Sequence, residues 1–241
     1  WSRGLGDVYK RQAYNACVPK LSEYSTEVGQ NENLYKAYQD LADSIEYASL
    51  DSAQKKVIQN ALRDFRLSGV SLPPDKKARY KELASELANF CSQFQDNLLD
   101  ATQAYTRHIT DESLLSGLPE SALAAARQTA VGKNLDGWLF TLEFPSYIAI
   151  MTYADNRELR EAFYTAYSTR ASDQGPTAGQ FDNTEIMEKI LARRHEQAQL
   201  LGFQHYAEES IATKMAASPE AVIGFLSDLA KRSLPYARKD L

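Results

Sequence analysis

The 241-residue chain is long enough for one large domain or two smaller ones, and its hydrophobic (44%) and charged (24%) fractions are those of an ordinary globular protein. Its 27 Lys and Arg residues against 32 Asp and Glu residues give a net charge of −5. This mild acidic excess argues against non-specific nucleic-acid binding, which requires a basic surface, and it indicates no particular substrate.

The cysteines and the apolar stretches indicate the compartment. Cys17 and Cys91 are the two cysteines, and they lie far apart, outside any Cys-x-x-Cys spacing. They suit a reducing compartment, in which both would be small buried hydrophobes. The longest apolar stretch, from Tyr147 to Tyr153, is too short to cross a bilayer, and no signal peptide is recognisable. We therefore expect a cytoplasmic protein that does not bind a membrane.

The two ends of the sequence have unusual features. The chain opens on Trp1, and the run from Asp7 to Gln12 resembles the translation of a transposase adaptor used in DNA library preparation. We therefore treat residues 1–12 as an adaptor-derived, non-native tail that contacts little of the fold; a natural polar arm is the alternative. At the other end, Pro235 is typical of a first helical residue, and the chain stops about two turns later. These features predict a reading frame truncated on both sides.

Amphipathic helices are predicted for an N-terminal helical region over residues 13–131. The longest is one helix over residues 76–109, because its apolar stripe contains no Gly or Pro. A coiled-coil seam is the alternative, but packing against the two preceding helices is favoured. A further helix begins after Gly117-Leu118-Pro119 and ends at Gly132. The two preceding helices carry Leu34, Tyr38, Leu41, Ile45 and Ala48, and then, after a cap at Asp51 or Ser52, Ala53, Val57, Ala61, Leu62 and Phe65.

Residues 132–241 are predicted to form a β segment and further helices. The aromatic-rich residues 136–144 predict the main strand, with Trp138 and Phe140 on one face, and Pro145 then opens a short helix. The fold class is therefore mainly α, with many helices and one short β segment. Three more helices begin at the capping boxes Asp155–Glu158 and Asp182–Glu185 and at Ser218-Pro219, and the last should turn Val222, Phe225, Leu226 and Leu229 inward.

The three histidines offer no metal site at recognisable spacing. His108 and His205 have no Cys or second His at ligand distance along the chain. His195-Glu196 begins like the His-Glu-x-x-His zinc motif, in which two imidazoles one helical turn apart bind the metal, but Gln199 replaces the second histidine. The favoured interpretation is a surface His-Glu pair on an amphipathic helix. No nucleophile elbow or phosphate-binding loop is complete either.

Several runs of residues occur in one order along the chain: Leu115–Ser121, Gly137–Leu142, Pro145–Tyr147, Asp155–Glu161, Tyr167–Asp173, Leu200–Phe203 with Tyr206-Ala207, and Ala212–Ala216. Together they resemble the thimet oligopeptidase (M3) family of zinc metallopeptidases, over essentially all of residues 13–241. None of them is a catalytic signature. The resemblance implies a zincin-like peptidase of two largely helical halves, of which this chain would be the upstream half.

The resemblance also implies a function. Members are cytoplasmic metalloendopeptidases that hydrolyse short unfolded peptides in a deep channel, and we expect the complete protein to be a monomer with no nucleic-acid or membrane partner. One zinc ion, held by His-Glu-x-x-His and a downstream Glu, activates water with the motif's Glu as general base. The motif is absent from the 241 residues. No catalytic, cofactor-binding or metal-binding residue is therefore assigned, and the chain alone is expected to bind no zinc and to be inactive. The alternative is a stand-alone helical protein-interaction module without catalysis.

Overall fold

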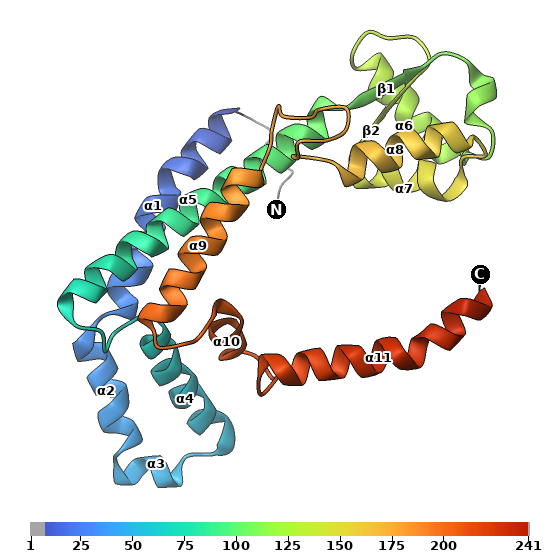
Figure 1. Ribbon diagram of the computed structural model, residues 1–241. Helices are drawn as coiled ribbons and strands as arrows, with labels where there is room; N and C mark the ends of the chain where they lie inside the picture. The colour runs from blue at the N-terminus through green and yellow to red at the C-terminus, as the bar shows by residue number, and fades with distance from the viewer. Residues whose placement is uncertain (1–7, 241) are drawn as a thin grey trace. The chain divides into compact units, whose positions relative to one another are not determined.

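The computed structural model describes residues 8–240, which are mainly helical and include one two-stranded antiparallel sheet (Figure 1). The chain divides into two compact units. Unit 1 comprises residues 8–16 and 90–189, and unit 2 comprises residues 17–89 and 190–240. None of the described helices is both long and apolar enough to cross a membrane.

Three helices contribute residues to both units, and the other elements belong to one unit each. The shared helices are α1 (Val8–Gly29), α5 (Pro74–Ala104) and α9 (Thr184–Leu200). Unit 1 adds β1 (Thr106–Ile109), the 3-10 helix η2 (Glu112–Leu115), α6 (Glu120–Val131), β2 (Trp138–Thr141), α7 (Phe144–Tyr153) and α8 (Arg157–Ser168). Unit 2 adds α2 (Glu32–Ala42), α3 (Ile45–Ser49), α4 (Ser52–Leu67), α10 (Tyr206–Ile211) and α11 (Pro219–Asp240).

The core of unit 1 forms between the sheet and helices α6, α7 and α8 (Figure 1). Trp138 and Phe140, two residues apart on β2, belong to the same buried cluster, which confirms their predicted common face. Ile150 of α7 and Phe163 of α8 are completely buried in this cluster. Burial of these apolar side chains is the main stabilising term of the unit.

The predicted 76–109 helix is confirmed through Ala104, but its last residues form a strand. α5 is continuous from Pro74 to Ala104, and Thr106–Ile109 then pairs antiparallel with β2, with Ile109 opposite Trp138. An isolated strand would leave its backbone hydrogen-bonding groups unpaired, so pairing with β2 overrides the helical period. The β segment is also shorter than the predicted 136–144, because Gly137 adopts a turn conformation (φ +83°) and Glu143 is the N-cap of α7.

In unit 2, aromatic contacts join α2 to α4. The ring of Phe65 lies 5.9 Å from that of Tyr35 and 5.8 Å from that of Tyr38, centroid to centroid. The predicted helix through Leu34–Ala48 is divided into α2 and α3, because Ser44 adopts an extended conformation between them. The apolar spacing therefore did not show which side chains are covered, and Ile45 is 94% exposed.

The helix starts follow the predicted caps in part. Asp51 and Gln54 form the full capping box of α4, and the Ser218 hydroxyl accepts a hydrogen bond from Ala221 N (3.2 Å) at the start of α11. At α8 the N-cap is Asn156, whose side chain accepts from Leu159 N (3.0 Å), so the Asp155 box is wrong. Asp155 instead accepts a hydrogen bond from the Ser116 hydroxyl (2.7 Å). The Asp182 side chain accepts a hydrogen bond from Thr184 N (2.9 Å). The predicted capping box of Asp182 with Glu185 is therefore also wrong.

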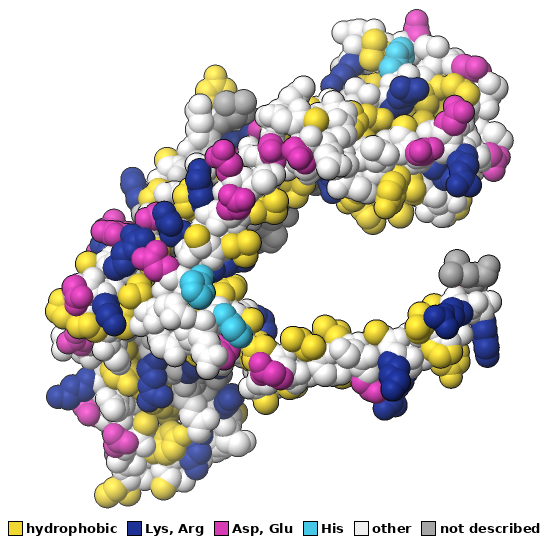
Figure 2. Space-filling model, in the orientation of Figure 1, with side chains coloured by type: hydrophobic (Ala, Val, Ile, Leu, Met, Phe, Trp, Pro, Cys, Tyr) yellow, Lys and Arg dark blue, Asp and Glu magenta, His cyan; other side chains and the backbone are white. Residues whose placement is uncertain are grey.

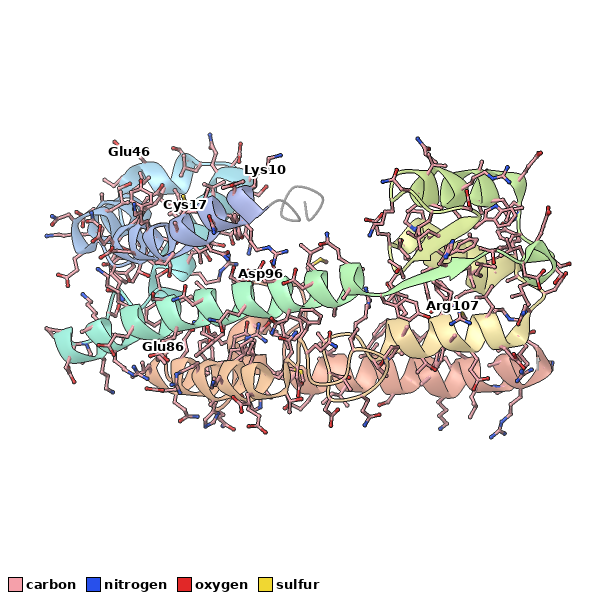
Figure 3. All side chains as sticks on the ribbon, turned by 90° about the horizontal axis from the view of Figure 1, so that it is seen from above. Lys10, Cys17, Glu46, Glu86, Asp96 and Arg107 are labelled. Atoms are coloured by element: carbon pink, nitrogen blue, oxygen red, sulfur yellow. The ribbon has the colours of Figure 1, made fainter. Side chains whose placement is uncertain are left out.

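Residues 1–7 of the predicted tail lie outside the described residues, whereas residues 8–12 begin α1. Arg11 forms a bidentate ion pair with Asp100, with both N–O distances 2.8 Å, and its Nε lies 3.6 Å from Asp96, which is labelled on α5 in Figure 3. The expectation that this segment contacts little is therefore wrong for Arg11. The adaptor origin of residues 1–12 stays a prediction.

Three further expectations are corrected. Pro235 lies inside α11 and does not begin a helix. Cys17 is exposed and Cys91 is partly exposed, so they are not the buried hydrophobes expected. The apolar face of α11 does not point inward, since every residue from Ile223 to Asp240 is exposed. Amphipathic spacing shows which face of a helix is apolar, but not whether another element covers it.

Candidate functional site

The His195-Glu196 pair lies on α9, where the glutamate forms a structural ion pair. The Glu196 carboxylate accepts hydrogen bonds from Arg79 Nε (2.6 Å) and Nη2 (2.9 Å), a bidentate contact between α9 and α5. Arg79 also donates from Nη1 to Glu82 (2.9 Å). Glu86, labelled in Figure 3, lies beside α9 and pairs with Arg193. Acidic and basic side chains thus alternate along the α5–α9 contact.

This ion pair makes Glu196 a poor general base. The hydrogen bonds from Arg79 lower the pKa of the Glu196 carboxyl, with a further contribution from the Arg193 charge. A general base at neutral pH needs a raised pKa and a free oxygen facing the reacting proton. Glu196 has neither, because both of its oxygens accept hydrogen bonds from Arg79.

The position of the missing second histidine has a structural role of its own. The Gln199 side-chain amide donates to the backbone carbonyls of Phe203 (3.2 Å) and Gln204 (2.7 Å), and so closes the loop between α9 and α10. His195 is exposed on the same helix. The His-Glu-x-x-Gln run is therefore explained by helix packing and loop closure, which supports the surface-pair interpretation.

The described part of the chain, residues 8–240, does not offer a set of side chains that fits zinc. His108 Nε2 forms a short hydrogen bond with the backbone carbonyl of Asp136, and His205 is the exposed N-cap residue of α10. Within residues 8–240, no three His, Cys, Asp or Glu side chains are grouped so as to hold a metal ion. Zinc needs at least three such ligands in tetrahedral arrangement, so no metal-dependent step is assigned to the chain.

A shallow depression of about 260 Å³ lies in unit 1 beside β1, where Figure 3 labels Arg107. Its polar side-chain groups are one guanidinium, one imidazole, two carboxylates, one amide and the Thr110 hydroxyl, and its lining contains no Ser or Cys nucleophile. Asn156 and Asp111 both serve as caps of neighbouring helices. The depression therefore offers a polar surface rather than catalytic chemistry. It is lined by Arg107, His108, Ile109, Thr110, Asp111, Leu114, Asn156, Glu158, Leu159 and Ala162.

Comparison with known proteins decides the family. Residues 7–77 match the profile described as "Neurolysin/Thimet oligopeptidase, N-terminal domain", and residues 150–241 match "Peptidase family M3". The chain belongs to peptidase family M3. The M3 resemblance carried by the short runs is thereby confirmed, and the described residues of both matched segments are mainly helical, as it implied.

Curated M3 relatives include bacterial and plant oligopeptidases. Oligopeptidase A of Escherichia coli (strain K12) is 58% identical over 231 residues, which are 96% of this chain and 34% of the relative. Oligopeptidase A of Haemophilus influenzae is 54% identical over the same shares. The probable cytosolic oligopeptidase A of Arabidopsis thaliana is 37% identical over 88% of this chain and 30% of its own length. The chain thus spans about a third of the length of these M3 peptidases.

Within the segment that matches family M3, Glu209 of α10 is a partly buried carboxyl that the sequence pattern did not indicate. Its Oε1 accepts a hydrogen bond from Gln197 Nε2 (2.8 Å), while Oε2 is buried without a hydrogen-bond partner among the described residues. Burial raises the pKa of Glu209, and the Gln197 bond and the Arg194 charge offset part of this. Burial, and then the Glu209 charge, raise the pKa of Tyr80 to about 12.

This environment predicts a pH-dependent contribution to stability. Because the pKa of Glu209 is raised above its ordinary 4.5, the folded chain keeps the proton to higher pH than the unfolded chain. The stabilisation that this proton contributes is complete below the pKa of Glu209 in the unfolded chain. It is lost as the pH rises through the pKa of Glu209 in the folded chain. We expect the free energy of unfolding of the unmodified chain, relative to Glu209→Gln, to fall as the pH rises above the ordinary glutamate pKa of 4.5, as measured in urea titrations.

Replacement of the exposed Glu161 by Gln serves as the control and should show a smaller dependence. A difference between the unmodified chain and Glu209→Gln that stays constant over this pH range would contradict the argument.

Proposed function

We propose that this chain supplies the upstream helical part of a zinc-dependent oligopeptidase of the oligopeptidase A type, which hydrolyses short unfolded peptides in a deep channel. The observation that carries the proposal is the 58% identity with Escherichia coli oligopeptidase A along 96% of the chain. Two family matches at the two ends of the chain, residues 7–77 and 150–241, support the same order of segments.

In this proposal the chain forms part of the scaffold and holds none of the catalytic groups. Zinc would polarise the peptide carbonyl and activate water, and its ligands would lie outside these 241 residues. The contribution of this chain is rigidity, because the Arg79–Glu196 and Arg193–Glu86 pairs join α5 to α9. A channel lined by helices that such ion pairs join would keep a constant width. It would therefore admit only peptides without folded structure.

The cellular setting belongs to the same proposal. We infer a cytoplasmic monomer whose partners are short peptides, in line with the name of the Arabidopsis relative, "Probable cytosolic oligopeptidase A". The net charge of −5 supports the absence of a nucleic-acid partner.

The test joins residues 13–241 to the part of Escherichia coli oligopeptidase A that follows the matched region. We expect this chimaeric chain to hydrolyse a fluorogenic oligopeptide, a chelator to abolish the activity and zinc to restore it. The 241-residue chain alone should hydrolyse nothing above buffer, because its three histidines are not brought together.

Two outcomes would contradict the proposal. Zinc-dependent hydrolysis by the 241-residue chain alone would show that it holds a site of its own. A folded but inactive chimaera would instead favour the alternative of a helical interaction module without catalysis.

A further inference from the structure

The large apolar side chains of α11 are exposed in unit 2. The helix runs from Pro219 to Asp240, and none of its residues is buried. Figure 2 shows hydrophobic side chains along its length. The large apolar side chains that are at least half exposed are Ile223 (64%), Phe225 (67%), Leu226 (54%), Leu229 (50%), Leu234 (50%) and Tyr236 (70%).

Four of these side chains form a stripe, whereas Ile223 and Leu234 lie on the other side of the helix. Phe225, Leu229 and Tyr236 recur at spacings of four and seven, with Leu226 beside them, so they share one side of the helix. Single exposed apolar residues are ordinary, but a continuous stripe along a 22-residue helix is typical of an interaction surface. We call these four residues the α11 stripe.

The charges of α11 indicate the chemistry of what covers it. Lys231, Arg232, Arg238 and Lys239 lie in its second half against the single acid Asp240, and Arg232 pairs with Asp228 one turn earlier (2.8 Å). A partner surface that fits this half needs an apolar groove with carboxylates at its rim, because complementary charges orient docking and like charges oppose it.

We propose that the α11 stripe docks into such a groove formed by the remaining part of an M3 oligopeptidase chain. The inference rests on the proposed function. α11 lies within residues 150–241, the segment that matches peptidase family M3, and this chain corresponds to only 34% of the length of Escherichia coli oligopeptidase A. About two thirds of the relative therefore lie outside the matched region, which is enough chain to cover a helix whose residues from Ile223 to Asp240 are all exposed.

The test places one charge on either side of α11, both in the 241-residue chain and in the chimaera with the following part of Escherichia coli oligopeptidase A. Leu229→Asp places the charge in the stripe, and Ser227→Asp places it roughly 160° around the helix. In the 241-residue chain both variants should leave the unfolding transition nearly unchanged, because both positions are exposed.

In the chimaera, docking should slow amide hydrogen exchange across residues 222–234 by more than about tenfold relative to the chain alone. Leu229→Asp should restore fast exchange and lower the melting temperature, and Ser227→Asp should do neither. Equal effects of the two variants in the chimaera, or exchange as fast as in the chain alone, would overturn the proposal.

The outcomes separate this inference from the proposed function. An active chimaera whose α11 exchange is fast and insensitive to Leu229→Asp refutes the docking but keeps the peptidase assignment. An inactive chimaera with a protected, Leu229-dependent α11 supports the docking and contradicts the function. If sedimentation shows that the 241-residue chain forms a dimer that Leu229→Asp dissociates, and α11 stays fast-exchanging in the chimaera, a second copy covers the stripe and the proposal is wrong.

Discussion

Replacement of Phe163 by alanine is expected to lower the free energy of unfolding by about 3–5 kcal/mol, the largest effect of any single substitution considered for this chain. The Phe163 side chain is completely buried in the cluster between the sheet and helices α6 to α8. Its ring meets the Tyr105 ring edge to face, with centroids 5.6 Å apart, so the substitution removes an aromatic contact as well as apolar area.

The neighbouring aromatic residue gives a matched control. Tyr164 is 58% exposed, so Tyr164→Ala should change the free energy of unfolding by less than about 1 kcal/mol. Urea unfolding followed by circular dichroism measures both variants, and Trp138 fluorescence reports on the cluster that contains Phe163. If the two variants unfolded at the same urea concentration, the core assigned to unit 1 would be wrong.

Replacement of Gly117 by alanine is the second change with a large expected effect, about 2–4 kcal/mol of destabilisation. Gly117 has φ +85°, a conformation that costs side-chain-bearing residues energy. A Cβ atom there would also lie 2.2 Å from the Tyr153 carbonyl oxygen, at the place where Asp155 N donates to the Ser116 carbonyl (2.9 Å). The backbone approach between these two segments leaves no space for a methyl group.

Gly132 provides the control for this prediction. Its φ of −62° is helical, and the nearest atom to an added Cβ is 3.5 Å away. Gly132→Ala should therefore be neutral or stabilise the chain by up to about 1 kcal/mol, through a smaller loss of backbone entropy on folding. Thermal melts of the two alanine variants should move in opposite directions or differ clearly; equal melting temperatures would contradict the close approach at Gly117.

The sequence predicted the elements whose signals are local. The Asp51 cap, the helix after Pro119 and the uninterrupted α5 stripe through Ala104 depend on residues within a few positions of one another. The strand Thr106–Ile109 could not be found in this way, because its apolar spacing also fits the preceding helix. Its state is decided by Trp138–Thr141, about thirty residues further along the chain.

In the candidate site, too, the sequence predicted the local features but not the long-range contacts. Gln199 in place of a histidine was sufficient to predict that His195-Glu196 is not a zinc motif. The spacing could not show that Glu196 pairs with Arg79, which is 117 positions earlier, nor that Glu209 is partly buried beside Gln197. Such pairings come from the packing of α5, α9 and α10, which has no signature in a single sequence.

The division of the chain into two units has a consequence for folding during synthesis. The core cluster of unit 1 lies within residues 109–166, one continuous stretch, so it can fold as soon as α8 leaves the ribosome. Unit 2 combines residues 17–89 with residues 190–240, so it is complete only after the second segment has been synthesised. Closing the 117-residue separation of Arg79 and Glu196 costs about 1 kcal/mol more chain entropy than closing the sheet between Ile109 and Trp138. The nascent chain would thus lack the ion pairs between α5 and α9 while the sheet is already complete.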